Sequence, residues 1–217
     1  MDIRVGGGYS MSNFWFGEGI RKGKKTERFP FAPPEEPPER PSRMEGSGEP
    51  YCPTQAIKDG KWDAGRCIFC RFCEPGYTPT GKQDIFKVNR TEPVLKKSFY
   101  IYKLDSGACG ACNVELETIF DPQYDANRLN IFITNSPRHA DAIVVMGVHT
   151  DGMKEALKNA YEAMPEPKLI ISMGACSISG GIIGESPIGR EKYHVEIAGC
   201  PPSPYTILEA LARARGD

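Results

Sequence analysis

The sequence predicts an α/β fold in which a doubly wound parallel sheet occupies residues 96–217. Short runs rich in Val, Ile and aromatic residues alternate there with helical patterns, as is typical of buried parallel strands joined by crossover helices. The chain of 217 residues is long enough for this domain and a smaller appendage. The expected strands are 98–104, 130–134, 142–146, 169–173 and 195–198.

Two helices are expected between and after these strands. In 152–164, apolar side chains recur at spacings of three and four residues, and Pro165 then stops the helix. The last helix covers about 203–213, with Pro204 just inside its start. Both patterns give one apolar face, which we expect to pack on the sheet.

The first 95 residues contain too few apolar residues for a comparable core. Residues 1–50 are expected to form an extended arm, since the stretch 30–41 is half proline. The aromatic cluster at 14–16 leaves two alternatives, a disordered tail or an arm lying across a partner subunit near a membrane. Residues 51–95 are short, glycine-rich and cysteine-rich, so a metal centre is expected to supply their folding energy.

Composition excludes several classes of function. Lys and Arg number 27 against 28 Asp and Glu, so no basic field points to nucleic acid. No apolar run reaches the ~18 residues that a spanning helix needs. The N-terminus lacks the apolar centre of a secretory signal, so a cytoplasmic location is expected. Thiols there bind metals more often than they form disulfides, although four disulfides are the alternative.

The eight cysteines form two sets of four. The first set is Cys52, Cys67, Cys70 and Cys73. Bacterial ferredoxins with two clusters combine a C-x2-C-x2-C run with a Cys of a distant Cys-Pro pair, and here the run 67–73 matches the pair Cys52-Pro53. Only half of such a ferredoxin is present, so crossed ligation predicts one [4Fe–4S] cluster. A structural zinc is the alternative, because four cysteines also bind Zn²⁺.

The second set follows the carboxyl ends of three expected strands, where open α/β sheets bind ligands. Its members are Cys109, Cys112, Cys176 and Cys200. Glycines beside them allow the backbone to approach a bulky cluster. A thioredoxin-like dithiol at the C-x-x-C pair is the alternative, and the two distant cysteines argue against it.

Four sequence motifs together resemble the pattern of a known family. They are C-x-x-C-N-x-E, S-P-x-H-A-D, G-x-C-x-x-S-G-G and G-C-P-P-x-P, within 109–115, 136–147, 174–181 and 199–204. This pattern resembles the small subunit of [NiFe] hydrogenases and the homologous 20 kDa subunit of respiratory complex I. The resemblance covers essentially all of 96–217. It implies a flavodoxin-like domain in which the second set holds the [4Fe–4S] cluster nearest a catalytic large subunit.

The spacing of the first pair discriminates within this superfamily. In the complex I type of this subunit the two cysteines of this pair are adjacent. Cys109 and Cys112 are separated by two residues, which resembles the hydrogenase spacing. The chain also lacks the further C-terminal domain and the export signal typical of periplasmic hydrogenases. The resemblance therefore implies a membrane-associated group 4 [NiFe] hydrogenase, in which this chain is a non-catalytic electron relay. A ferredoxin-linked quinone or sulfur-compound oxidoreductase is the second hypothesis, and a zinc-stabilised scaffold is the third.

The implied cofactors are two [4Fe–4S] clusters, without nickel, flavin or nucleotide in this chain. The implied partners are the large subunit, a ferredoxin or ferredoxin-like subunit, and membrane-embedded subunits on the cytoplasmic side. Glu115 has two interpretations, a proton relay or interface residue and a helix N-terminal carboxylate. His139 matches the family motif as a structural or interface residue. His149 and His194 are expected on the surface or in a satisfied core position.

Overall fold

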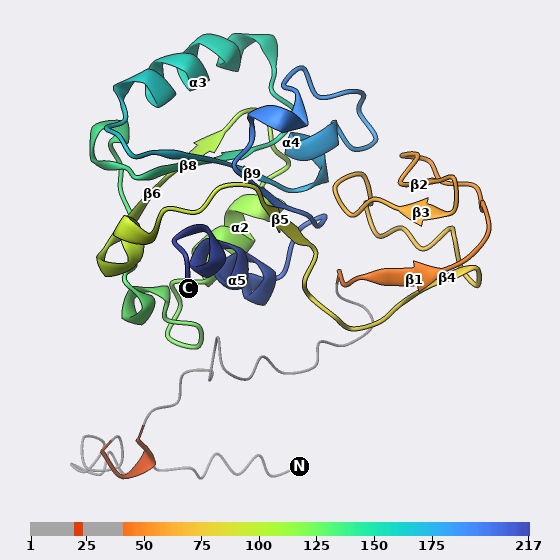
Figure 1. Ribbon diagram of the computed structural model, residues 1–217, viewed down its shortest axis with the longest axis horizontal. Helices are drawn as coiled ribbons and strands as arrows, with labels where there is room; N and C mark the ends of the chain where they lie inside the picture. Colours follow the sequence, from red (N-terminus) through yellow and green to blue (C-terminus); the bar gives the residue numbers. More distant parts are fainter. Residues whose placement is uncertain (1–19, 24–40) are drawn as a thin grey trace, which may run out of the picture.

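The computed structural model describes residues 20–23 and 41–217. Within these ranges a six-stranded sheet with its helices forms a large lobe, and two short two-stranded sheets form a small lobe beside it (Figure 1). The expected aromatic cluster at 14–16, and all but the last residue of the proline-rich stretch 30–41, lie outside the described residues.

The large sheet has the strand order β7-β6-β8-β9-β10-β5. Five of its strands are parallel, and numbering them along the chain gives the order 2-1-3-4-5 of a flavodoxin-like sheet. All five expected strands are therefore confirmed. The parallel strands are β6 (Phe99–Asp105), β7 (Ile131–Ile133), β8 (Ala142–Met146), β9 (Leu169–Met173) and β10 (Val195–Ile197).

The sixth strand was not predicted. β5 (Phe86–Val88) pairs antiparallel with β10, with Phe86 opposite Ile197 and Val88 opposite Val195. It comes from the segment that the sequence assigns to the cysteine-rich appendage, so this segment also contributes the edge of the large sheet.

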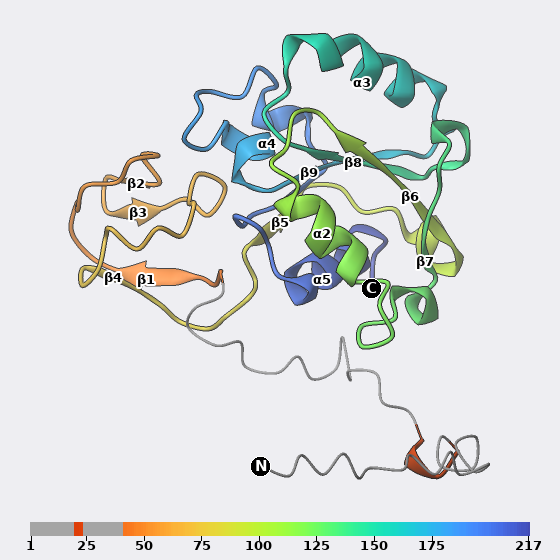
Figure 2. The same cartoon turned by 180° about the vertical axis from the view of Figure 1, so that it is seen from behind.

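Helices cover both faces of the sheet. α2 (Ala111–Thr118) and α5 (Pro204–Ala214) lie on one face, and α3 (Asp151–Ala163) and α4 (Ala175–Ser179) on the other (Figures 1 and 2). Successive residues of β8 point to opposite faces, so Val144 packs in the core under α2 and α5, and Val145 in the core under α3. The two expected helices are confirmed as α3 and α5.

The small lobe has little apolar core. β1 (Met44–Gly46) pairs with β4 (Tyr77–Pro79), and β2 (Ile57–Lys58) pairs with β3 (Lys61–Trp62), both antiparallel. Its buried core consists of Met44, Ile57 and Tyr77, with Trp62 and Cys73 packed at its edge. The 3-10 helices of the described chain are η1 (Pro93–Lys97), η2 (Ala126–Leu129), η3 (Pro137–His139) and η4 (Arg190–Lys192).

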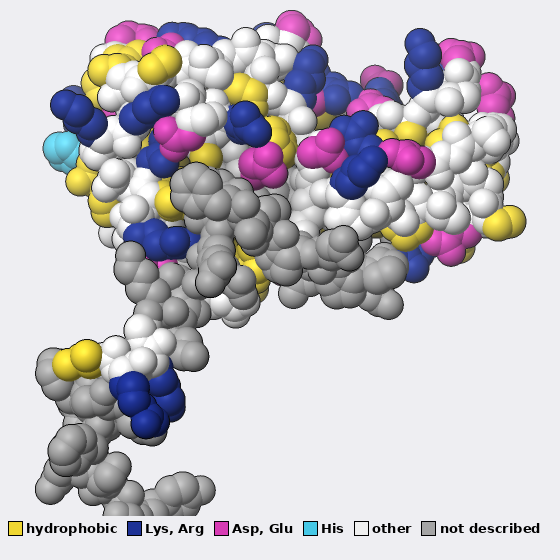
Figure 3. Space-filling model, turned by 60° about the horizontal axis from the view of Figure 1, so that its bottom comes forward, with side chains coloured by type: hydrophobic (Ala, Val, Ile, Leu, Met, Phe, Trp, Pro, Cys, Tyr) yellow, Lys and Arg dark blue, Asp and Glu magenta, His cyan; other side chains and the backbone are white. Residues whose placement is uncertain are grey.

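Across residues 20–23 and 41–217, none of the helices combines the length and apolar character needed to span a bilayer. On the face shown in Figure 3, basic and acidic side chains are interspersed over both lobes.

Candidate functional site

The second set of cysteines gathers at the carboxyl edge of the parallel sheet. Cys109 lies just before α2, and Cys200 follows β10 by three residues. Cys112 and Cys176 are each the second residue of a short helix, α2 and α4, where the sequence suggested loops. α2 follows β6, which is the strand where the sheet order reverses, and the crevice at such a point is where doubly wound sheets bind ligands.

The electrostatics of Cys112 show that these four thiols lie together. Burial raises the pKa of Cys112 to about 12, and the charges of the other three thiols raise it next. The pKa of Cys176 is raised as well, mainly by burial and next by the charge of Cys109. Four thiols that oppose each other's ionisation resist losing their protons at neutral pH, and a metal centre that ligates the thiolates offsets this cost.

The backbone around Cys112 leaves no room for a larger residue at position 174. Gly174 has a φ of +90°, and a Cβ there would lie 2.6 Å from the Cys112 Sγ. The amide of Ala175 also donates to the carbonyl of Gly199 at 2.9 Å, so the loop of Cys176 is joined to the loop of Cys200. Glycine is required here by both the backbone angle and the close approach of the sulfur.

Asp105 organises the loop that carries Cys109. Its carboxylate accepts hydrogen bonds from the amides of Gly107 and Ala108 at 2.9 and 2.8 Å, and from the Asn113 side chain at 3.0 Å. Burial raises the pKa of Asp105, but these three bonds outweigh it and lower the pKa overall. None of the sequence motifs includes Asp105, although an Asp two residues before a glycine is a signal for such a turn.

His149 lies in a buried polar network that includes Ser177, the neighbour of Cys176 in the sequence. Its Nδ1 lies 2.9 Å from the Ser106 hydroxyl, and its Nε2 lies 2.8 Å from the Tyr193 hydroxyl. Ser106 donates to the Met146 carbonyl at 2.7 Å, and Nε2 also lies 3.0 Å from the Ser177 carbonyl, which can only accept a hydrogen bond. The ring is therefore a satisfied core residue, one of the two alternatives expected. Its bonds join the loops after β6 and β8 to the segment before β10.

The other singled-out residues lie apart from this network. His194 is half-buried and accepts a hydrogen bond from the Ile170 amide at 3.0 Å, whereas His139 is exposed in η3. Glu115 is half-buried in the second turn of α2, and its charge contributes to the raised pKa of Cys112. The first turn of α2 contains no acidic residue, which argues against the N-terminal carboxylate interpretation of Glu115.

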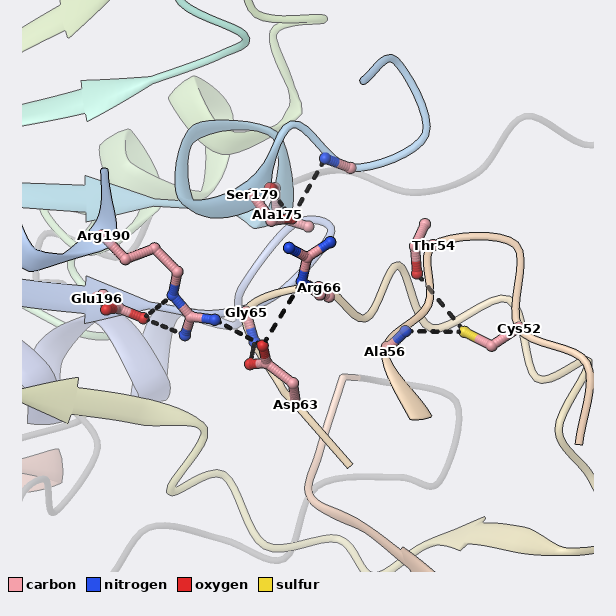
Figure 4. Close-up of polar contacts among 11 residues, drawn as sticks. Cys52, Thr54, Ala56, Asp63, Gly65, Arg66, Ala175, Ser179, Arg190 and Glu196 are labelled. Carbon is pink, nitrogen blue, oxygen red and sulfur yellow. Dashed lines mark hydrogen bonds and ion pairs between the residues drawn. The ribbon is translucent and has the colours of Figure 1, made fainter. Parts of the chain in front are cut away.

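The first set of cysteines lines a single narrow cavity in the small lobe. Its members are Cys52, Cys67, Cys70 and Cys73. The Cys52 sulfur accepts from the Ala56 amide at 3.2 Å, as Figure 4 shows, and the Cys67 sulfur accepts from the Phe69 amide at 3.4 Å. Burial raises the pKa of Cys67 to about 11, and the charges of Cys52 and Cys73 add to it.

Two buried donors in this cavity lack acceptors. Within residues 20–23 and 41–217, three buried side-chain nitrogens have no hydrogen-bond partner, and two of them, Trp62 Nε1 and Arg71 Nη2, belong to residues lining the cavity. The Trp62 N–H lies near enough to Cys67 to lower the pKa of that thiol, although it forms no hydrogen bond of normal geometry. Sulfides and thiolates of an iron–sulfur cluster are the acceptors that such donors would meet, so the residues fit the group.

None of the eight cysteines forms a disulfide. In the described part of the chain, no three or more His, Cys, Asp or Glu side chains are arranged to hold a single metal ion.

Comparison with known proteins identifies the large lobe. Residues 109–214 match the family described as NADH ubiquinone oxidoreductase, 20 Kd subunit. Formate hydrogenlyase subunit 7 of Escherichia coli is 38% identical over 56% of this chain and 50% of its own length. The probable membrane-bound hydrogenase subunit mbhJ of Pyrococcus furiosus is 36% identical over 55% of this chain and 75% of its own length.

Quinone-linked relatives match as well. NAD(P)H-quinone oxidoreductase subunit K of Microcystis aeruginosa is 38% identical over 48% of this chain and 45% of its own length. A solved structure of the membrane-bound sulfane sulfur reductase, an archaeal respiratory membrane complex, has a TM-score of 0.47 and 27% identity over 55% of this chain and 70% of its own.

The family match includes Cys109, Cys112, Cys176 and Cys200 but does not reach the first set. The chain therefore belongs to the family of the 20 kDa subunit of NADH:ubiquinone oxidoreductase.

Proposed function

We propose that this chain is an electron-transfer subunit of a membrane-associated [NiFe] hydrogenase, and that each set of cysteines holds one [4Fe–4S] cluster. One observation carries the proposal: at each of two sites, four thiols from separate parts of the chain lie within electrostatic range of one another. When bound, each cluster would supply one-electron chemistry at a potential set by its surroundings.

The protein's own groups determine those surroundings. At the first site the amides of Ala56 and Phe69 donate to cysteine sulfurs, and the Trp62 indole adds a further dipole. At the second site Asp105 and Gly174 hold the cysteine loops in place. N–H donors stabilise the more reduced, more negative state of a cluster, so these groups tune where electrons reside.

The exposed residues around the second site suit a large catalytic subunit. Val114, Ile182 and Ile183 are each more than 60% exposed, and they lie in the sequence next to Cys112 and α4. Exposed apolar side chains of this size are typical of an interaction surface. Glu115, half-buried beside Cys112, would lie at the rim of that surface as an interface or proton-relay residue.

The first site would receive electrons from a ferredoxin or a ferredoxin-like subunit. Residues 51–95 resemble half of a ferredoxin fused to the family domain of 96–217, and residues 1–50 would be an arm contacting a partner. Electrons would then pass from the first site to the second, and from there to Ni–Fe in the large subunit. The assembly would lie on the cytoplasmic side of the membrane, next to ion-translocating subunits.

A second candidate keeps the relay and changes the final acceptor. The match to a quinone oxidoreductase subunit favours a ferredoxin-linked quinone reductase. The spacing of Cys109 and Cys112 favours hydrogenase, because the corresponding two cysteines are adjacent in the quinone-linked type that the family resemblance implies. The large subunit decides between them, since two C-x-x-C pairs would be needed there for Ni–Fe.

The test is the activity of the intact membrane complex that contains this chain. Reduced ferredoxin is supplied anaerobically, and hydrogen is measured by gas chromatography alongside reduction of a quinone analogue. Hydrogen evolution that is lost on removal of this chain supports the proposal. Quinone reduction without hydrogen would replace it by the second candidate. A complex that accepts no electrons from ferredoxin would contradict both.

A further inference from the structure

The two cysteine-bearing lobes are joined by one guanidinium. Arg190 Nε donates to the Glu196 carboxylate at 3.0 Å, and Nη1 donates to the Asp63 carboxylate at 2.5 Å (Figure 4). Glu196 lies in β10 of the large sheet, whereas Asp63 follows β3 of the small lobe. The two carboxylates lie far apart in sequence, yet the same side chain binds both.

Each carboxylate precedes a proposed cluster ligand by four residues. Asp63 precedes Cys67, and Glu196 precedes Cys200. On the small-lobe side the connection is continuous: the Asp63 amide donates to the Ala56 carbonyl at 2.7 Å, and the Ala56 amide donates to the Cys52 sulfur at 3.2 Å. Successive hydrogen bonds, through Ala56, Asp63 and Arg190, therefore connect the Cys52 sulfur of the first site to β10, the strand that precedes Cys200 of the second site.

Apolar contacts between the lobes lie beside this guanidinium. Trp62, Ala64 and Phe69 of the small lobe pack against a buried cluster that includes Ile178 and Ala198. The backbone at Gly65 lies so close that a Cβ there would come within 2.8 Å of Ile178. Beside this contact is an open cleft of about 470 Å³. Apolar contact is non-directional, whereas a guanidinium fork fixes the orientation of the groups it binds.

Burial of Glu196 anchors Arg190 on the large-lobe side of this connection. Only 5% of the Glu196 side chain is exposed, and Arg190 supplies its ion pair. Burial lowers the pKa of Arg190, but the bonds to Glu196 and Asp63 outweigh it and raise the pKa overall. Arg190 cannot leave Glu196 without leaving a buried charge uncompensated, whereas its link to Asp63 joins two side chains that are each 36% exposed.

We propose that Arg190 is a positioning residue that fixes the two cluster sites relative to each other and so sets the rate of electron transfer between them. The proposal rests on the presence of two clusters in the proposed function. Electron transfer through protein falls off exponentially with distance, so small displacements of one lobe change its rate. Arg190 acts through the loop of Asp63 and the strand of Glu196, and it does not itself bind a cluster.

The test is Asp63→Asn in the full chain with its clusters. The Gly65 amide donates to Asp63 Oδ1 at 2.9 Å, and the amide oxygen of the substituted side chain can still accept this bond. Glu196 keeps its bond to Arg190. The ionic link between the lobes is lost, together with a 4.0 Å pair to Arg66 within the small lobe.

Asp84→Asn is the matched control. Asp84 lines the same cleft and pairs with Arg43 at 2.7 Å, without a bond to Arg190. The control therefore removes one carboxylate charge and one ion pair from the cleft and leaves the connection through Arg190 intact.

The readout is the magnetic interaction between the two fully reduced clusters in the EPR spectrum, with the rate of electron equilibration between them. We expect Asp63→Asn to lose the resolved splitting and to slow equilibration while each cluster remains present, and Asp84→Asn to behave as the wild type. Wild-type splitting in Asp63→Asn, or equal loss in both variants, would overturn the proposal.

A second variant covers the case in which Asp63→Asn loses a cluster. Arg190→Lys keeps a charge beside Glu196 but cannot bind two carboxylates as a fork, so the same loss of splitting is expected. A retained splitting in Arg190→Lys would refute the positioning role. A wild-type protein that shows one cluster signal would instead refute the two-cluster proposal, a distinct failure.

Discussion

The Cys112 sulfur lies directly against the backbone of Gly174. A Cβ at position 174 would be 2.6 Å from that sulfur, and the φ of +90° is one that other residues rarely adopt. The two residues come from loops after β6 and β9, so this contact fixes how closely two cysteine-bearing loops approach at the edge of the sheet.

Gly174→Ala is therefore expected to abolish the second cluster and leave the first. The methyl group would displace Cys112 or the start of α4, and strain at this φ adds about 1 kcal/mol or more. The measurement is iron content with the EPR signals of the reduced protein. Gly152→Ala, at a glycine with open space around its Cα, serves as the control. Full iron content in Gly174→Ala would contradict the assigned site.

Cys200→Ala is expected to abolish turnover of the complex with little effect on the first cluster. Cys200 lies in the large lobe after β10, and its charge contributes to the raised pKa of Cys112, so its loss removes one of four thiols from the second site only. Turnover and EPR of the same preparation give the answer. If activity and both cluster signals survived, the ligand assignment would be wrong.

Asp105→Ala is expected to loosen the loop before α2. It removes three hydrogen bonds from an exposed carboxylate, two of them to backbone amides, and exposure limits the cost to about 1 kcal/mol. If the loop must open before iron leaves, 1 kcal/mol corresponds to about five-fold faster loss of iron from the second cluster to a chelator. The exposed Asp121→Ala is the control, and equal rates in the two variants would argue against the role of Asp105.

The His149 network gives the protein a pH dependence below neutrality. Burial lowers the pKa of His149, and the Ser177 carbonyl partly offsets it. Because the unfolded ring binds a proton near pH 6.5 and the folded ring resists it, this contribution to stability is present above about pH 6.5 and is lost as the pH falls below it. Burial also lowers the pKa of His194, which acts in the same direction.

The measurement is the thermal unfolding midpoint between pH 7 and pH 5. We expect His149→Gln to show a shallower decline than the wild type, with the remaining slope due to His194. His139→Gln, at an exposed position, is the control and should follow the wild type. An unchanged slope in His149→Gln would exclude the ring as the source.

The sequence predicts the parallel sheet well because its strands carry their own signal. β8 is a continuous apolar run and β9 is apolar apart from Ser172, as is typical of buried parallel strands, and α3 and α5 show apolar periodicity. β5 has three residues, and its pairing with β10 is a tertiary event without local periodicity. α2 and α4 are also short, and glycines with positive φ precede both of them.

The candidate sites divide in the same way. The first set of cysteines is readable from its spacing, and the second from its places after three expected strands and from the family motifs. Arg190 and His149 carry no such signal. Their partners lie up to 127 residues away, so only the folded chain brings them together.

Metal and sulfide analysis of the anaerobically purified protein tests the central claim most directly. Two cubane clusters require about eight iron and about eight sulfide per chain. Four iron with one zinc would retain only the second cluster. Stoichiometric zinc without iron would contradict the electron-transfer account altogether.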